Sequence, residues 1–152
     1  MDYERKNIMK INREFFDNYL KYILSALLII VIAVVVLYSI KTAVPKVEAD
    51  GIKVSGMYSL NLKYEDIQDI KLEDTLPEGL RKVNGIDIFG TAYIGNFSSP
   101  NINKLKVFVV SDKGPFIYIK AKNVDYHYVI INRKEKSKTE ELYNDIKSQI
   151  KK

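Results

Sequence analysis

Residues 22–40 read YILSALLIIVIAVVVLYSI, which is nineteen positions without a charged side chain between Lys21 and Lys41. At a rise of about 1.5 Å per residue, this run makes a helix of about 28 Å, close to the ~30 Å hydrocarbon core of a bilayer. Thirteen of the nineteen residues are Leu, Ile or Val, and each favours insertion near the bilayer centre by about 0.3–0.6 kcal/mol. A buried core helix rarely stays apolar on every face for this length. We therefore predict one transmembrane helix at residues 22–40.

A cleaved signal peptide is the main alternative, because Val47-Glu48-Ala49 loosely resembles a small-residue cleavage site. The apolar run is longer than the usual ~7–15 residues of a signal peptide. The leader before the run carries four acidic residues, and Pro45 and Lys46 separate the run from Ala49. These features favour an uncleaved anchor with Tyr22 and Tyr38 at the two headgroup levels, where interfacial aromatic residues lie.

The chain then divides into an N-terminal juxtamembrane arm at 1–21, the transmembrane helix at 22–40, a linker at 41–50 and one domain at 51–152. In the arm, apolar residues recur at three- and four-residue spacing, which predicts a helix that runs into the span: Ile8, Ile11, Phe15 and Tyr19. At 152 residues there is no room for a second domain beside the span.

Composition excludes several classes of protein. The chain has no cysteine, which rules out disulfides, thiolate metal sites and cysteine nucleophiles. The net charge of +5 is spread along the chain: Lys and Arg outnumber Asp and Glu by five to four in residues 1–21 and by seventeen to thirteen in residues 51–152. Because no single block is strongly basic, we expect no nucleic-acid partner.

After Gly51 the hydrophobic period changes from helical to alternating, and short β-rich runs lie between turn signals. We expect strands at residues 52–55, 57–62, 67–72, 82–88, 91–97, 104–111, 116–121 and 125–132, with a helical turn at Tyr64-Glu65-Asp66. The sequence predicts a mainly β domain: an antiparallel barrel or sandwich of about seven strands.

A C-terminal helix is predicted from about Lys138 to Ile150. Ser137-Lys138-Thr139-Glu140 has the spacing of a capping box. Leu142, Ile146 and Ile150 follow at four-residue steps, so one face of this helix can cover apolar sheet surface and close an open end of the domain.

The order of strands and terminal helix resembles the pleckstrin-homology (PH) superfold, and the stretch Ile67 to Phe97 is similar to the core signature of bacterial PH domains. The matching positions are the strand Ile67 to Leu72, Leu76-Pro77, the basic and glycine positions Arg81, Lys82 and Asn84-Gly85, then Gly90 and Gly95-Asn96-Phe97. The resemblance covers about residues 51–150. It implies a PH-like barrel capped by the C-terminal helix in a membrane-anchored member of that family.

This resemblance does not imply phosphoinositide binding. Phosphoinositide-binding PH domains hold phosphates with basic residues around the first strand turn, whereas here that turn is Val54-Ser55-Gly56-Met57 with only Lys53 nearby. We expect no phosphoinositide site.

The residues that could carry chemistry do not form a recognisable set. His127 is the only histidine, and one His without Cys makes a poor zinc site. An acidic stretch is read as a solvated face, with a weak cation site as the alternative; it comprises Glu65, Asp66, Asp69, Glu73, Asp74 and Glu78. We therefore expect no catalytic, cofactor-binding or metal-binding residue, and no cofactor. A hydrolase that uses His127 is the remote alternative.

The most basic run lies just before the C-terminal helix and contains Arg133, Lys134, Lys136 and Lys138. We read it as solvated, with contact to anionic lipid headgroups as the alternative. The function expected from the sequence is a non-enzymatic, membrane-anchored PH-like interaction module that binds a protein partner or another copy of itself. The alternative is a module that binds anionic lipid headgroups through the basic run.

The flanks of the span predict its orientation. Five basic residues precede it, Arg5, Lys6, Lys10, Arg13 and Lys21, and three follow it in an equivalent window, Lys41, Lys46 and Lys53. The positive-inside rule then places the N-terminus in the cytoplasm and the domain outside the cytoplasm. Protease added to intact protoplasts should therefore degrade the C-terminal domain. Survival of that domain until the membrane is lysed would reverse the orientation.

Overall fold

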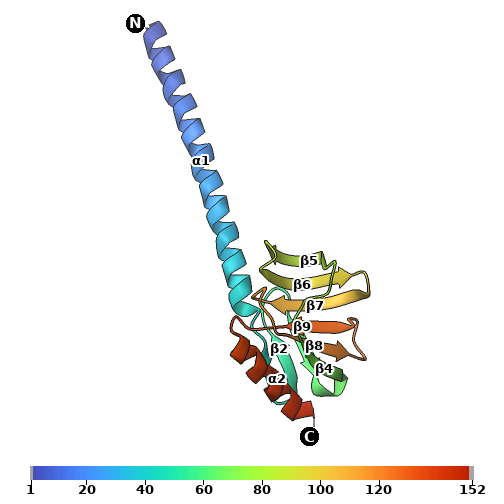
Figure 1. Ribbon diagram of the computed structural model, residues 1–152. Coiled ribbons are helices and arrows are strands. Elements are labelled where there is room, and N and C mark those ends of the chain that lie inside the picture. The colour runs from blue at the N-terminus through green and yellow to red at the C-terminus, as the bar shows by residue number, and fades with distance from the viewer. Residues whose placement is uncertain (1, 151–152) are drawn as a thin grey trace. The chain divides into compact units, whose positions relative to one another are not determined.

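The computed structural model describes the backbone of residues 2–150 and the side chains of Phe16 and residues 19–150. The chain forms two compact units, Met1–Tyr38 and Ser39–Lys152, and each is described by itself. Figure 1 labels the elements, which are α1 (Asp2–Thr42), β1 (Lys46–Val47), β2 (Gly51–Val54), β3 (Leu60–Lys63), the 3-10 turn η1 (Tyr64–Asp66), β4 (Ile67–Glu73), β5 (Arg81–Ile88), β6 (Ala92–Ser99), β7 (Ile102–Val109), β8 (Phe116–Ala121), β9 (Tyr128–Ile131) and α2 (Lys136–Ile150).

The first unit is helix α1 without its last residues. The apolar segment of α1, Tyr19–Thr42, has a mean hydropathy of 3.1, and only 6% of its most apolar stretch is buried. A core helix of a soluble domain would bury one face, so this segment has the character of a membrane span: it is long and apolar enough to cross a bilayer. The predicted stripe of Ile8, Ile11 and Phe15 lies outside the described side chains, although the backbone there is helical, as predicted.

The last turn of α1 belongs to the second unit. Ser39 and Ala43 are buried, with 4% and 2% of their surface exposed, and Ile40 and Ala43 pack with the main apolar cluster of the domain. Residues 41–50, where we expect a linker, contain the buried Pro45 and strand β1, which pairs antiparallel with β2. The domain therefore begins within the helix.

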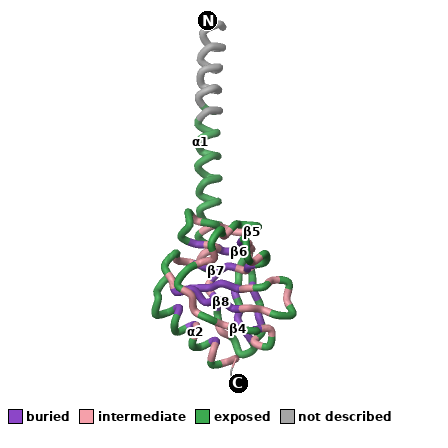
Figure 2. Tube along the Cα trace, turned by 45° about the vertical axis from the view of Figure 1, so that its right-hand side comes forward, coloured by how far each residue is buried: buried purple, intermediate pink, exposed green. Residues whose placement is uncertain are grey.

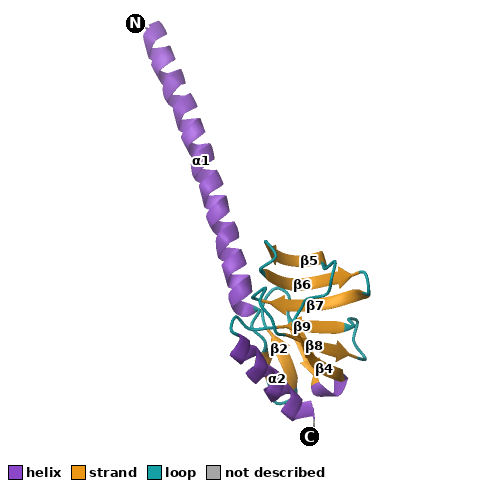
Figure 3. Ribbon diagram, in the orientation of Figure 1, coloured by secondary structure: helices purple, strands orange, loops and turns teal. Residues whose placement is uncertain are grey.

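The second unit contains two sheets. The smaller has the order β1-β2-β3, and the larger has the order β4-β8-β9-β7-β6-β5, which can be followed from bottom to top in Figure 3. The mainly β prediction is confirmed, with nine strands in place of about seven. Neither sheet closes on itself within the described residues.

The pairing of the central strands differs from the prediction. We expected an antiparallel arrangement throughout, but β7 pairs with β9 in parallel, with Leu105 opposite Tyr128. The chain makes this possible by running through β8 before it returns as β9 between β7 and β8. Central strands that are buried on both faces consist of continuous apolar runs. Such a run shows that a strand is buried, but it does not show whether the strand is parallel or antiparallel to its neighbour.

Apolar side chains cover both faces of the large sheet. Ile117, Ile119 and Val129 contribute to a cluster shared with the small sheet and α2. Val107, Tyr118 and Ile130 belong to a second cluster, against which Leu76 and Leu80 of the β4–β5 loop pack. Figure 2 shows the buried positions concentrated along β7 and β8.

Helix α2 covers the main cluster as predicted. Leu142 and Ile146 are buried, and Ile150 packs at the edge of the same cluster. The predicted start is two residues late, because α2 begins at Lys136 and Ser137 therefore lies inside the first turn. The buried Thr139 makes the side-chain contact at the start of α2, because its hydroxyl accepts a hydrogen bond from the Arg133 amide at 3.0 Å.

Candidate functional site

A groove of about 400 Å³ lies between the edge of the small sheet and one end of strands β5, β6 and β7. We call it the asparagine groove, because three of its lining residues are asparagines contributed by three different strands. Its lining consists of Ser59, Leu60, Asn61, Val83, Asn96, Phe97, Asn103, Lys104, Leu105, Lys106, Asp125 and Tyr126.

The alternation of the strands brings these polar side chains to the surface. Asn61 lies between the buried Leu60 and Leu62 on β3, so its side chain points away from the core. On β7, Asn103 and Lys104 precede the buried Leu105. The sequence thus places apolar side chains in the core and carboxamides in the groove.

Two hydrogen bonds join the β2–β3 connection to the large sheet beside this groove. The Lys106 Nζ donates to the Ser59 carbonyl oxygen at 3.4 Å, and the Tyr58 hydroxyl donates to the Asn84 Oδ1 at 3.4 Å. Both bonds are exposed and longer than the usual length, which makes them weak. The groove walls are therefore held mainly by the packing below them.

Tyr126 forms an apolar wall of the groove with a polar tip. Burial raises the pKa of its hydroxyl to about 12, and the nearby carboxylates of Asp125 and Asp66 add to the shift. Because the pKa is raised, the hydroxyl stays protonated at all physiological pH values and remains a hydrogen-bond donor. Between about pH 10 and 12 the Tyr126 hydroxyl loses its proton in the unfolded state but keeps it in the folded state. The contribution of Tyr126 to the free energy of unfolding is therefore fully present below pH 10 and is lost as the pH rises to about 12.

The basic run lies at the opposite end of β7 from the asparagine groove. A second cavity of about 480 Å³ is lined there by Val44, Val110, Arg133, Lys134, Glu135, Lys138, Glu141, Leu142 and Asp145. Val44 is two residues beyond the end of α1, so this cavity adjoins the point where the chain leaves the helix.

The four predicted lipid-contact residues do different things in the structure. The Arg133 guanidinium donates to the Pro45 carbonyl oxygen, and burial lowers the pKa of this side chain while Glu141 opposes the shift. Lys138 pairs with Glu141 at 2.7 Å, and Lys136 pairs with Glu140 at 3.9 Å. Arg133 therefore joins the start of the domain to its end, which the basic pattern in the sequence did not indicate.

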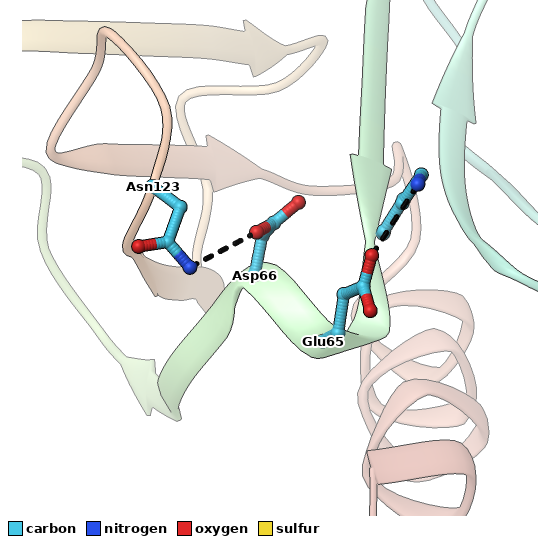
Figure 4. A network of polar contacts seen from close by, with 4 residues as sticks. Glu65, Asp66 and Asn123 are labelled. Carbon is cyan, nitrogen blue, oxygen red and sulfur yellow. Dashed lines mark hydrogen bonds and ion pairs between the residues drawn. The ribbon is translucent and has the colours of Figure 1, made fainter.

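The acidic stretch does not converge on one point. Figure 4 shows Asp66 facing Asn123, whose amide donates to the Asp66 carboxylate at 3.5 Å, whereas Glu65 pairs with Lys63 at 3.3 Å. No group of three His, Asp or Glu residues that could hold a metal ion is found among the described side chains. Glu65 and Asp66 thus contact different partners.

His127 lies in the bend before β9, and its side chain is exposed. Its backbone is tied down on both sides, because its amide donates to the Lys104 carbonyl and its own carbonyl accepts from the Ala121 amide. The structure places His127 in a strand connection, and it does not line either of the two cavities described above.

Comparison with known proteins adds no relative: no protein family, curated protein or solved structure matches this chain. The site is therefore interpreted from its own geometry.

The different contacts of the basic residues give a direct test. Arg133→Ala should lower the free energy of unfolding of the domain by about 1–3 kcal/mol, because it removes a charged donor and leaves the Pro45 carbonyl without that bond. Lys134→Ala, the matched control one residue away, should change it by about 0.5 kcal/mol or less. Urea unfolding of the full chain in detergent micelles, followed by the near-ultraviolet circular dichroism of its tyrosines, measures both values. Equal effects of the two variants would show that Arg133 is a solvated surface residue.

Proposed function

We propose that this chain is a non-enzymatic, membrane-anchored interaction module whose asparagine groove binds an extended segment of a protein partner or of a second copy of the chain. The apolar segment of α1 supplies the anchor, and the domain that begins at Ser39 supplies the docking surface. A distant relation to bacterial PH domains is part of this proposal. A mainly β domain followed by a helix supports that relation, and the parallel β7–β9 pair departs from it.

The observation that carries the proposal is the chemistry of the groove. A carboxamide offers both a donor and an acceptor, which are the two groups that an extended peptide backbone presents. Asn61, Asn96 and Asn103 line the groove together with the apolar surfaces of Val83 and Phe97. Its volume of about 400 Å³ is within the ~300–1,000 Å³ range of binding pockets. Such a surface suits recognition of a short segment by backbone and side chain together.

The free edges of the large sheet are less suited to binding by strand addition. Both edge strands are irregular: β4 has a register shift between Ile67 and Asp69, and β5 has one between Lys82 and Asn84. Bulges of this kind protect edges from pairing with another chain. Val83, at the β5 irregularity, instead lines the asparagine groove.

The groove also lies where a partner can reach it. Strand β7 runs from Asn103 at the groove to Val109, next to the cavity that contains Val44. At about 3.3 Å per residue these two ends are about 20 Å apart. Asn103, at one end of the groove, is therefore well separated from the cavity that contains Val44.

A second candidate function is contact between the basic run and anionic lipid headgroups. The cavity that Val44 shares with Lys134 favours it, because Val44 is only two residues beyond the anchor helix. Two of the four basic residues are paired with Glu140 and Glu141, and such exposed pairs reduce the charge available to lipid. We therefore rank this function below docking at the groove.

Site-specific photocrosslinking in native membranes tests the proposal. A benzophenone amino acid at Asn103 or Val83 should give a discrete adduct with one protein, at twice the 17.6 kDa chain mass if the partner is a second copy. The same probe at the exposed Asn144 of α2 is the matched control and should give none. Asn61→Asp combined with Asn96→Asp should weaken the adduct at Val83, because carboxylates cannot donate as amides do.

Equal adducts from the groove and from Asn144, or none from the groove, would contradict the docking function. A probe at Glu135 tests the lipid alternative in anionic vesicles. Lipid adducts there that fall steeply as salt rises from about 0.05 to 0.5 M would favour headgroup binding by the basic run.

A further inference from the structure

Three large apolar side chains are exposed among the described residues of the domain. They are Met57, Val83 and Phe89, with 66%, 67% and 100% of their surface exposed. Val83 lines the asparagine groove. Met57 and Phe89 line neither of the two cavities and contribute nothing to the core.

Phe89 occupies a position that disfavours it. It lies at the tip of the β5–β6 hairpin, where Phe89 and Gly90 have φ angles of 47° and 76° and the Thr91 amide donates to the Ile88 carbonyl at 2.8 Å. Turns that need positive φ at both central residues favour Asn, Asp or Gly, because a Cβ makes this backbone strained. A phenylalanine here is strained and packs against nothing, so the stability of the domain does not explain it.

The hairpin tip projects from the end of the large sheet at which β7 ends. β6 begins just after the tip, and its Tyr93 pairs with Val109 at the end of β7. The next residue, Val110, lines one cavity with Val44, two residues beyond α1. Figure 1 shows this end of the sheet, where β7 and β9 also terminate.

Met57 follows a residue that lies against the end of α1. The preceding residue, Gly56, has φ 107°, and a Cβ placed on it would lie 2.5 Å from the Thr42 hydroxyl oxygen. Thr42 is the last residue of α1. Met57 therefore lies beside the point where the helix ends.

We propose that Phe89 and Met57 insert into the interfacial layer of the same membrane and give the domain a second attachment to lipid. This inference rests on the anchoring proposed above and is independent of docking at the groove. An apolar side chain in the interface is stabilised by the area that it removes from water. Phe89 lies on the hairpin at the Val110 end of the sheet, and Met57 follows the residue that lies against Thr42. A lipid surface is the apolar partner that the anchor brings to this part of the domain.

The absence of tryptophan from the chain makes a clean experiment possible. Phe89→Trp creates a single fluorophore in the full chain, reconstituted in phosphatidylcholine and phosphatidylglycerol vesicles. Its emission should shift to shorter wavelength and be quenched by lipids brominated near the headgroup end of the acyl chain. Lipids brominated near the chain terminus should quench it less.

Two single-tryptophan variants are the controls. Val83→Trp lies on β5, the strand that leads to the hairpin tip, and Val83 is also exposed. It is six residues from Phe89, or about 20 Å away, and it should show neither the shift nor the quenching. Val31→Trp, within the apolar segment, should be quenched by lipids brominated near the chain terminus and so reports on the anchor alone.

The outcomes separate the inference from the anchoring. Quenching at Val31→Trp without quenching at Phe89→Trp would overturn the inference and leave the anchor standing, whereas loss of both would overturn the two together. A shift at Phe89→Trp without quenching by brominated lipid would show that protein covers the tip, which also overturns it. Phe89→Asn suits the turn, so it should leave the thermal midpoint of unfolding unchanged. Combined with Met57→Trp, it should reduce the quenching of that tryptophan by brominated lipid. Unchanged quenching at Met57→Trp would exclude joint insertion of the two side chains.

Discussion

The constraint on which the rest of this structure depends is the burial of the last turn of α1 in the core of the domain. Ala43 is 2% exposed, and it packs with Ile40 against a cluster that includes Ile52 and Ile146. A helix end that is buried in this way cannot also be embedded in lipid. The segment available to a bilayer then ends at about Tyr38, and the seventeen residues from Tyr22 to Tyr38 make about 26 Å of helix, which is near the lower limit for a span.

Several contacts converge on this junction from distant parts of the sequence. The Arg133 guanidinium donates to the Pro45 carbonyl, and the buried Asn132 next to it accepts from the Val110 amide at 2.9 Å and donates to the Ser111 carbonyl at 2.8 Å. One end of the large sheet is thereby joined to the start of the domain. The opposite end of β7 carries Asn103 of the asparagine groove.

Much of the secondary structure was predictable because it depends on local patterns. The strand at 116–121 and the turn at Tyr64–Asp66 were predicted with the bounds observed, and the stripe Leu142, Ile146 and Ile150 identified the inner face of α2. The neighbours of each strand were not predictable, because Ile67 pairs with Ala121 more than fifty residues away. Alternation shows which face of a strand is buried, but it says nothing about strand order or direction.

The candidate sites were less predictable than the fold. The asparagines of the groove are far apart in the sequence and come together only through the contact of the two sheets, so no local motif marks them. The basic run was recognisable, but its pattern did not separate Arg133, which folds inward to Pro45, from the exposed Lys134. Phe89-Gly90 carried a signal that could have been used, since a phenylalanine before a glycine at a hairpin tip is an unusual choice for a turn with positive φ.

Hydrogen exchange of the full chain in lipid vesicles tests the burial of this junction most directly. If the domain begins within the helix, the amides of Ala43 and of β1, which pair with Ser39 and β2, should exchange slowly and together with those of the domain core. Exchange of residues 43–47 at the rate of an unstructured peptide, while β7 and β8 stay protected, would contradict the account and show that a free linker joins the anchor to the domain.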